Sequence, residues 1–251
     1  MSNGIDDSTT LCVTPVFDKI CASNQSKNDF ISLLNTKFLR HIPCVEEAPW
    51  KKVFYGRNEK RFSPSKSRLR WLVTQLFNSK KLIVKEERNV REFTREKRNS
   101  LFQGDPETKI EAEDAIEHDR AQPWMIFEGR TAPDVCIITD QYVLIVEGKQ
   151  TEGKRTTTTK WDNRRDQLIR HMDAFLDDEN KVIYGLFICE ESSKSAYNLE
   201  EYKNGHIFEQ SLKHRDAGSI EKVREGYLGV ISWEELEERF NVRIGQKPVK
   251  N

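Results

Sequence analysis

Two carboxylates and one amine stand close together near the middle of the chain. Pro133-Asp134 is followed, after twelve intervening residues, by Glu147-Gly148-Lys149. Paired carboxylates can hold hard, oxygen-seeking cations such as Mg²⁺, and such a metal polarises a phosphoryl oxygen and helps to generate hydroxide. An adjacent lysine can orient the attacking water or stabilise charge that develops in the transition state. Asp134, Glu147 and Lys149 are therefore candidates for metal-assisted chemistry on a phosphate.

The residues between these side chains predict how they come together. Two apolar, strand-like runs, 135–139 and 142–146, are separated by a two-residue turn, which predicts an antiparallel hairpin. In such a hairpin the start of one strand lies beside the end of the next, so we expect the two carboxylates at one edge. Because side chains alternate faces along a strand, Glu147 and Lys149 should share a face while Gly148 points away.

The segments around the hairpin predict a sheet that is flanked by helices. Their apolar periodicity indicates the order helix, three strands, helix and strand, with a last strand and helix near the C-terminus. We expect these elements at residues 108–118, 124–127, 135–139, 142–146, 159–176, 181–189, 227–233 and 234–240. Residues 191–226 are polar and carry no clear pattern.

Pro133-Asp134 and Glu147-Gly148-Lys149, set in this order of elements, resemble the PD-(D/E)xK signature of the restriction-endonuclease-like nuclease superfamily. The likeness covers about residues 107–189. It implies an α/β fold with a mixed β-sheet flanked by helices. It also implies a reaction that uses Mg²⁺, for which Mn²⁺ is a possible substitute. It further implies that Asp134 and Glu147 are metal ligands and that Lys149 is the catalytic lysine.

The resemblance also implies a further glutamate from the helix that precedes the strands. Glu113 is the best candidate, because it lies three residues after Ile110 and three before Ile116, on the side that we expect to face inward. Glu117 is the reserve choice and Glu111 a weaker one. The strand and acidic helix at the C-terminus look loosely similar to the end of restriction endonuclease cleavage domains.

Polar residues near the motif could grip a phosphate backbone or support the lysine. An arginine offers a bidentate fork to phosphate, although solubility of the loops is the alternative interpretation. We expect His171, at the border of an apolar helix stripe, to be a hydrogen-bonded structural residue rather than a general base. The candidates for DNA contact are Arg130, Gln150, Lys154, Arg155, Lys160 and Gln167.

The motif also has a purely structural interpretation. Asp134 could begin a strand after a proline turn, and Glu147 and Lys149 could be exposed strand-end charges whose cross-strand pairing contributes about 0.2–1 kcal/mol. Against this stands the run 143–146, which is typical of a central strand buried on both faces. Sites in α/β sheets lie at the ends of such strands, so we favour the nuclease site.

The formal net charge of zero hides an uneven distribution. Residues 51–100 carry 16 basic and 5 acidic residues, whereas residues 101–251 carry 21 and 30. A basic block of this kind is a candidate phosphate-contacting surface, with a solvated helix face as the alternative. We therefore expect residues 1–104 to form a mostly helical, basic N-terminal region and residues 105–251 to form the nuclease core.

The rest of the composition indicates a cytoplasmic protein. The five cysteines are far apart and include no CxxC pair, so we expect free thiols rather than a zinc site or disulfides. No apolar run approaches the roughly 18 residues of a membrane span. The N-terminus lacks the pattern of a signal peptide.

These features predict a Mg²⁺-dependent endodeoxyribonuclease that acts on double-stranded DNA, of a restriction or phage-defence type. Restriction-type use, and a homodimer for cutting both strands, rest on the resemblance alone. A catalytically idle nucleic-acid-binding module of the same fold and a structure-selective or repair nuclease are the alternatives. A third alternative is a subunit whose basic face binds an acidic protein partner.

Overall fold

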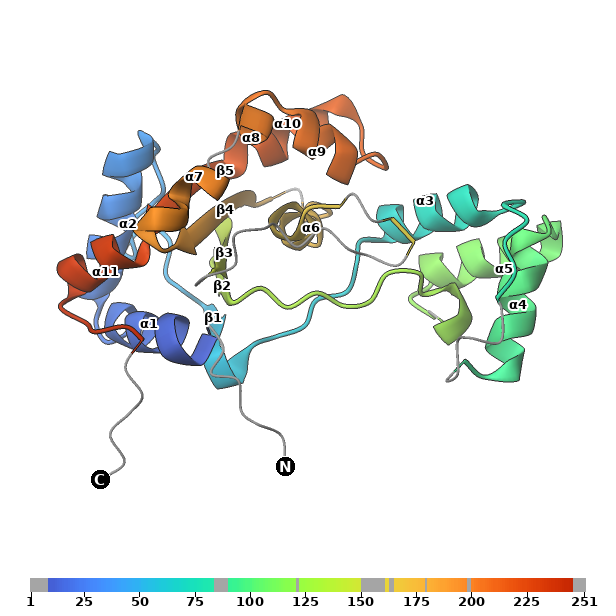
Figure 1. Cartoon of the computed structure of the whole chain (residues 1–251), viewed down its shortest axis with the longest axis horizontal. Helices are drawn as coiled ribbons and strands as arrows, with labels where there is room; N and C mark the ends of the chain where they lie inside the picture. The colour runs from blue at the N-terminus through green and yellow to red at the C-terminus, as the bar shows by residue number, and fades with distance from the viewer. Residues whose placement is uncertain are drawn as a thin grey trace.

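The structure, a computed structural model of the chain, describes residues 9–83, 90–120, 122–149, 161–162, 165–178, 180–197 and 200–245. Its centre is a mixed five-stranded sheet in the order β1-β2-β3-β4-β5, with helices on both faces (Figure 1). The first three strands are antiparallel neighbours, and the last two run parallel to β3. The strands are β1 (Lys52–Tyr55), β2 (Val135–Ile138), β3 (Tyr142–Gly148), β4 (Val182–Cys189) and β5 (Tyr227–Ser232). The predicted α/β class with a mixed, helix-flanked sheet is confirmed.

β3 is the central strand and is buried along its whole length. Its apolar side chains alternate between two cores, as a strand covered on both faces requires. Leu144 and Val146 pack into one core, and Val143 and Ile145 pack into the other. The predicted hairpin of β2 and β3 is confirmed, and so is the predicted strand at 181–189, which is β4.

Helices cover the two faces of the sheet in separate layers. The core that contains Leu144 and Val146 is closed by η1 (Thr9–Val13), α1 (Thr14–Cys21), α2 (Asn24–Phe38) and α11 (Trp233–Phe240). The opposite core is closed by α6 (Gln167–Asp173), α8 (Glu200–Lys203), α9 (His206–Ser211) and α10 (Ala217–Gly226). Side-chain caps start several of them: Ser23 caps α2, Asp166 caps α6 and Ser232 caps α11. The short η4 (Glu191–Ser193) and α7 (Lys194–Tyr197) connect β4 to α8.

Three α-helices and one 3₁₀-helix form a separate lobe beside the sheet. This helical lobe consists of α3 (Lys66–Leu76), α4 (Glu92–Phe102), α5 (Pro106–Glu117) and η3 (Pro123–Met125), and it has its own apolar core. Figure 1 shows it at the far end of the long axis from α1, α2 and α11. Two extended segments link it to the sheet, and they pair at Phe62 and Thr131 through two backbone hydrogen bonds of 2.8 Å.

Three expectations about local structure need correction. Residues 124–127 do not form a strand. They begin in the 3₁₀-helix η3, with Trp124 buried in the helical lobe, because a short apolar run fits a buried turn as well as a strand. The third antiparallel strand is instead β1. Ile110, expected to face inward, is 65% exposed, and the buried stripe of α5 runs through Ala112, Ala115 and Ile116.

The helix after the hairpin is shorter than expected. Residues 159 and 160, where it was expected to begin, lie outside the described residues, and α6 begins at Gln167 with Asp166 as its cap. Trp161, which lies within the expected range of this helix, precedes it and packs against the helical lobe.

The N-terminal region contributes to the sheet as well as to the helical lobe. β1 pairs with β2, and α1 and α2 lie on the same core as α11. The predicted helix at 234–240 is confirmed as α11, and α2 and α3 are helices within the region that was expected to be mostly helical. The functional division at residue 104 stays a prediction. Where the structure describes the chain, the cysteines are free and no helix is long and apolar enough to cross a bilayer.

Candidate functional site

Asp134 and Glu147 lie opposite each other at the ends of β2 and β3. Val135 pairs with Val146, so the next residues outward face each other in the antiparallel register. The side chain of Asp134 reaches across, and its Oδ2 accepts a hydrogen bond of 2.7 Å from the N–H of Gly148. The two carboxylates that the sequence singled out are therefore brought together on the face of the sheet that α6 covers.

Gly148 points to the other face, as strand alternation predicts. A Cβ atom on Gly148 would lie 2.9 Å from Cζ2 of Trp233 and 3.0 Å from Cγ2 of Val13. The indole Nε1 of Trp233 donates to the carbonyl of Lys149 at 2.7 Å, and the N–H of Lys149 donates to the carbonyl of Ile188 at 2.7 Å. Close packing and two hydrogen bonds thus fix the backbone that carries Glu147 and Lys149.

The ammonium group of Lys149 is held beside Glu147. Its Nζ donates to Oε1 of Glu147 at 2.8 Å and to Oε1 of Gln167 at 3.3 Å. Gln167, the first residue of α6, is a predicted site residue that the structure places in contact with the lysine. Lys149 is 6% exposed and Glu147 is 1% exposed. We refer to Asp134, Glu147 and Lys149 as the strand-end site.

Two further residues adjoin this site. His171, one helical turn after Gln167 on α6, places Nε2 3.1 Å from Oε2 of Glu147. The other ring nitrogen, Nδ1, lies 2.6 Å from Oγ1 of Thr131. The expectation that His171 is a structural, polar-partnered residue agrees with this geometry, and its i, i+4 spacing from Gln167 was the signal that links it to the site. Thr131 has no such signal, because its role depends on where α6 packs.

Burial and charge set the two carboxylates apart. Burial, reinforced by the negative charge of Glu147, raises the pKa of Asp134 to about 8, against the opposing effects of the Gly148 N–H and Lys149. Burial also acts to raise the pKa of Glu147, but His171 and Lys149 outweigh it and the pKa of Glu147 is lowered. The surroundings therefore favour the charged form of Glu147 and the protonated form of Asp134.

Glu113 is not at the strand-end site. It lies on α5 in the helical lobe, where its side chain is 41% exposed and its Oε1 is 3.6 Å from Nζ of Lys109. Figure 1 shows α5 well separated from β3. The predicted placement of Glu113 in the site assumed that Ile110 faces inward, which the structure contradicts. Glu111 and Glu117 share this helix and pair with other residues of the helical lobe.

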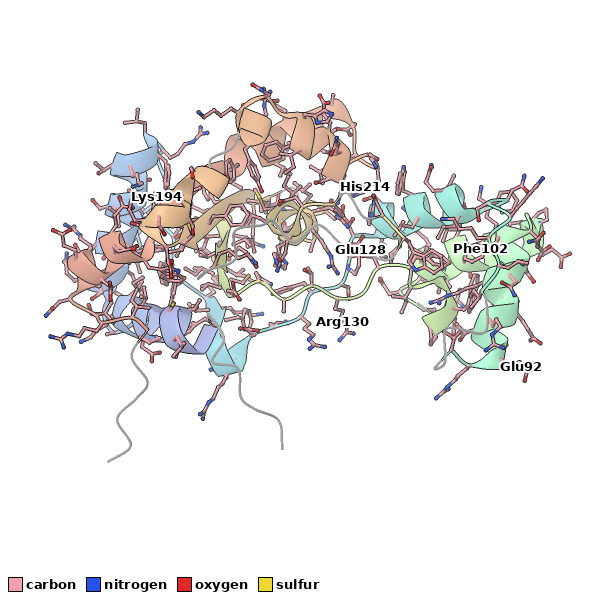
Figure 2. The ribbon with its side chains drawn as sticks, in the orientation of Figure 1. Glu92, Phe102, Glu128, Arg130, Lys194 and His214 are labelled. Carbon is pink, nitrogen blue, oxygen red and sulfur yellow. The ribbon has the colours of Figure 1, made fainter. Side chains whose placement is uncertain are left out.

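Arg130 is exposed on the extended segment that leads to Asp134. Figure 2 shows its side chain directed away from the ribbon into open space. The neighbouring segment carries three more exposed cations, Arg57, Lys60 and Arg61. The remaining predicted contacts, Gln150, Lys154, Arg155 and Lys160, lie outside the described residues.

A cluster of buried charges joins α6 to the helical lobe (Figure 2). Nε of Arg68 on α3 donates to Oε2 of Glu128 at 2.9 Å. Arg165, just before α6, pairs with both Glu128 and Asp173. Nε2 of His214 lies 3.0 Å from the carboxylate of Asp173. Burial acts to raise the pKa of Asp173, but His214 and Arg165 outweigh it and hold this pKa well below its ordinary value.

The donor set of the strand-end site fits a hard divalent cation. Among the described residues, no group of three or more His, Cys, Asp or Glu side chains is arranged to hold a metal. Mg²⁺ does not need one, because it is commonly bound through one or two carboxylates, with waters and substrate phosphates completing its octahedron. Asp134 and Glu147 supply two such carboxylates, and Oε2 of Glu147 is buried with no aligned hydrogen bond.

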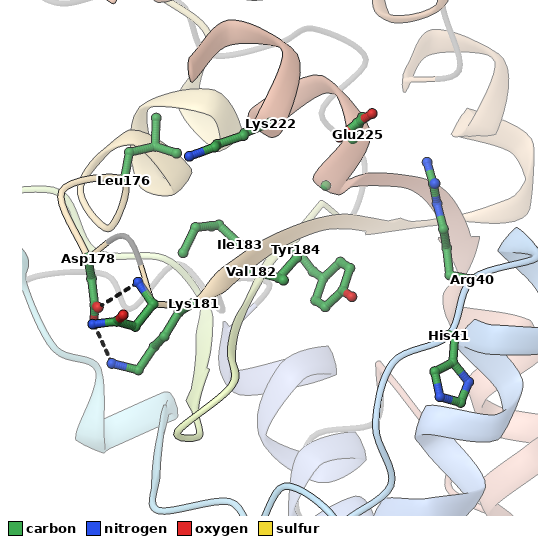
Figure 3. A pocket seen from close by; sticks show the side chains of 12 residues that line it. Arg40, His41, Leu176, Asp178, Lys181, Val182, Ile183, Tyr184, Lys222 and Glu225 are labelled. Atoms are coloured by element: carbon green, nitrogen blue, oxygen red, sulfur yellow. Dashed lines mark hydrogen bonds and ion pairs between the residues drawn. The ribbon is translucent and has the colours of Figure 1, made fainter. Parts of the chain in front are cut away.

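A cavity of about 550 Å³ lies at the other end of the sheet, where β4 begins. Tyr184 lines it, with Arg40 and His41 to one side and Lys222 on the opposite side (Figure 3). The cavity is therefore separate from the strand-end site, and its cations do not converge on one point.

Comparison of the chain with protein-family models, with curated proteins and with solved structures found no match.

Proposed function

We propose that the protein is a Mg²⁺-dependent endonuclease of the PD-(D/E)xK kind, which hydrolyses phosphodiester bonds in double-stranded DNA. The observation that carries the proposal is the strand-end site itself. Asp134 and Glu147 are side by side, with Nζ of Lys149 2.8 Å from Glu147, on rigid strands. The order α2, β1, β2, β3, α6, β4 supports it, because it matches helix, three strands, helix and strand, with the helical lobe inserted between β1 and β2.

The residues of the site divide the work of hydrolysis. Asp134 and Glu147 would hold the cation, which when bound supplies a Lewis acid for the phosphoryl oxygen and lowers the pKa of water. Lys149, kept in place by Glu147 and Gln167, would donate hydrogen bonds to the attacking water or to a non-bridging phosphate oxygen. Glu147 and Lys149 are buried and Asp134 is half-buried, so the scissile phosphate would approach from the side of Asp134.

Exposed cations near Asp134 would hold the DNA backbone. Arg57, Lys60, Arg61 and Arg130 lie on the two paired segments that run from the sheet to the helical lobe. Within the described residues their side chains enter no ion pair, although the ammonium of Lys60 lies over the rings of Phe54 and Phe62. All four side chains are exposed and can neutralise phosphates. Use in restriction or phage defence, and dimerisation for double-strand cutting, are part of the proposal and rest on the resemblance.

The test is cleavage of supercoiled plasmid by the purified chain with Mg²⁺. We expect nicked and linear products, and no products with EDTA. Discrete fragments from a longer duplex would indicate a recognition sequence, and faster cutting of flaps or hairpins would indicate a structure-selective nuclease. DNA binding with a steep salt dependence but without cleavage under any divalent metal would favour the idle binding module and contradict the proposal.

A further inference from the structure

We propose that Thr131 and His171 are positioning residues that hold the carboxylate of Glu147 in the orientation used in catalysis. The catalytic consequence of this inference rests on the proposed nuclease function. The arrangement itself rests on geometry alone, since Thr131, His171 and Glu147 are consecutive members of one chain of polar contacts, each 5% exposed or less.

The two ends of this chain of contacts are rigidly anchored. Thr131 is clamped by reciprocal backbone hydrogen bonds of 2.8 Å with Phe62. His171 is carried by α6, whose Leu168, Ile169 and Met172 are buried in the sheet core. Because both anchors are fixed, the imidazole ring between them has little freedom to rotate, and the nitrogen that faces Glu147 is held there.

The contact with Thr131 is compatible with a hydrogen on Nε2 of His171, the ring nitrogen that faces Glu147. A threonine hydroxyl can donate to Nδ1 of a neutral imidazole or accept from Nδ1 of an imidazolium. In both of these states Nε2 carries the hydrogen that faces Oε2 of Glu147, at 3.1 Å. Nε2 and Oε2 lie within hydrogen-bonding distance but are not aligned as a hydrogen bond.

This support leaves Glu147 able to bind a metal. A carboxylate has about four lone-pair sites on its two oxygens. Lys149 uses one site on Oε1 and His171 faces one on Oε2, so each oxygen retains one further lone pair. Groups that orient a ligating carboxylate in this way commonly change metal affinity or activity about 10–100-fold when they are removed.

Paired conservative and disruptive variants distinguish a positioning role of Thr131 and His171 from a general contribution to the fold. Thr131→Val, which keeps shape and removes the hydroxyl, and His171→Leu should each lower kcat, or raise the Mg²⁺ concentration for half-maximal cleavage, by about 10–100-fold. Thr131→Ser and His171→Gln, which retain the hydroxyl and a donor at the Nε2 position, should recover most of the loss. KM for DNA should change by less than about two-fold, because neither side chain is placed to touch the duplex.

A control variant tests whether loss of stability explains these effects. Ile116→Val in the core of the helical lobe should lower stability by about 0.5–1.5 kcal/mol and leave kcat unchanged. If Thr131→Val and His171→Leu lower kcat no more than this control does, or if the conservative variants recover nothing, the positioning role is wrong.

A measurement independent of cleavage keeps this inference distinct from the proposed function. ¹⁵N NMR of the histidine ring nitrogens should show that Nε2 of His171 carries hydrogen in the wild-type protein, and that Thr131→Val and Glu147→Gln both shift the His171 nitrogens. His171 with a bare Nε2 in the wild-type protein would overturn the inference. If the wild-type protein cleaves no DNA, the proposed function fails, and the NMR result still decides the arrangement.

Discussion

Gly148 shows how one residue without a side chain permits the strand-end site. Trp233 of α11 packs against its Cα and donates to the next carbonyl, so a larger residue would displace either the indole or the strand. We predict that Gly148→Ala lowers the free energy of unfolding by about 1–3 kcal/mol through overpacking. Urea denaturation of the variant and the wild-type protein measures this difference in the free energy of unfolding. Gly129→Ala is the matched control, because a Cβ atom there meets nothing within 4 Å; equal stability of the two variants would contradict the packing argument.

At the same scale, local periodicity explains which site residues the sequence could predict. Asp134, Glu147 and Lys149 follow from a hairpin and from the alternation of faces, both of which act between close neighbours. Thr131 and His171 depend on the packing of α6 against the sheet, which no local pattern encodes. The prediction that Glu113 lies at the site was wrong for the same reason, since the inward face of α5 is set by the helical lobe and not by the sheet.

At the scale of elements, α6 joins the strand-end site to the helical lobe. Its first turns carry Gln167 and His171, and Asp173 at its end belongs to the buried charge cluster. Charges that are buried this deeply need every partner, because the removal of one leaves the others uncompensated.

We therefore predict that Glu128→Gln destabilises the fold by about 3–5 kcal/mol, since it leaves the guanidinium groups of Arg68 and Arg165 without their shared carboxylate. Chemical denaturation tests this prediction. The matched control is Glu117→Gln, which removes an exposed partner of Arg70 and should change stability by less than about 0.5 kcal/mol. A change in Glu128→Gln as small as in the control would refute the predicted dependence on the buried cluster.

The start of α11 predicts a pH dependence. Glu235 closes a capping box with Ser232. Burial acts to raise the pKa of Glu235, but Lys37, the N–H of Ser232 and Lys194 together outweigh burial and lower this pKa from 4.5 to about 2. A lowered folded-state pKa means that the charge stabilises the fold above pH 4.5 and that this contribution is lost as the pH falls toward 2. Because the side chain is about one-third exposed, Glu235→Gln should cost about 1 kcal/mol at neutral pH.

Glutamine can keep the capping box, so this substitution isolates the charge of Glu235. Urea titrations at neutral pH and near pH 3 should show the difference between wild type and variant shrinking at the lower pH. A difference that stays constant between the two would mean that the charge does not stabilise α11.

Elements with strong internal patterns were predictable, and elements defined by their partners were not. The runs that became β2, β3 and β4 carry their own apolar signal. β1 is only four residues long and half-exposed, so it becomes a strand by pairing with β2. Trp124 carries the same apolar signal as a strand residue but is used in the helical lobe.

At the scale of the whole molecule, the zero net charge is divided between a basic segment and an acidic remainder that carries the strand-end site. We predict that duplex DNA is bound with a steep salt dependence, and that Arg61→Ala and Arg130→Ala each reduce the slope of log K against log salt by about 1. Fluorescence anisotropy with a labelled duplex measures the slope. Lys51→Ala is the control, because Lys51 pairs with Asp140 at the turn between β2 and β3. Slopes that fall equally in all three variants would contradict the placement of DNA along the linking segments.

The most direct test of the strand-end site is Mg²⁺-dependent cleavage by Asp134→Asn and Lys149→Met, measured under single-turnover conditions beside the wild-type protein. We predict that each variant loses at least about a thousand-fold in rate, the scale of removing a transition-state charge partner, while it keeps the wild-type fold and binds duplex DNA as tightly as the wild type. Lys149→Met should also lose stability, because it leaves the buried Glu147 without its ion-pair partner. Cleavage that persists at the wild-type rate in both variants would contradict the account.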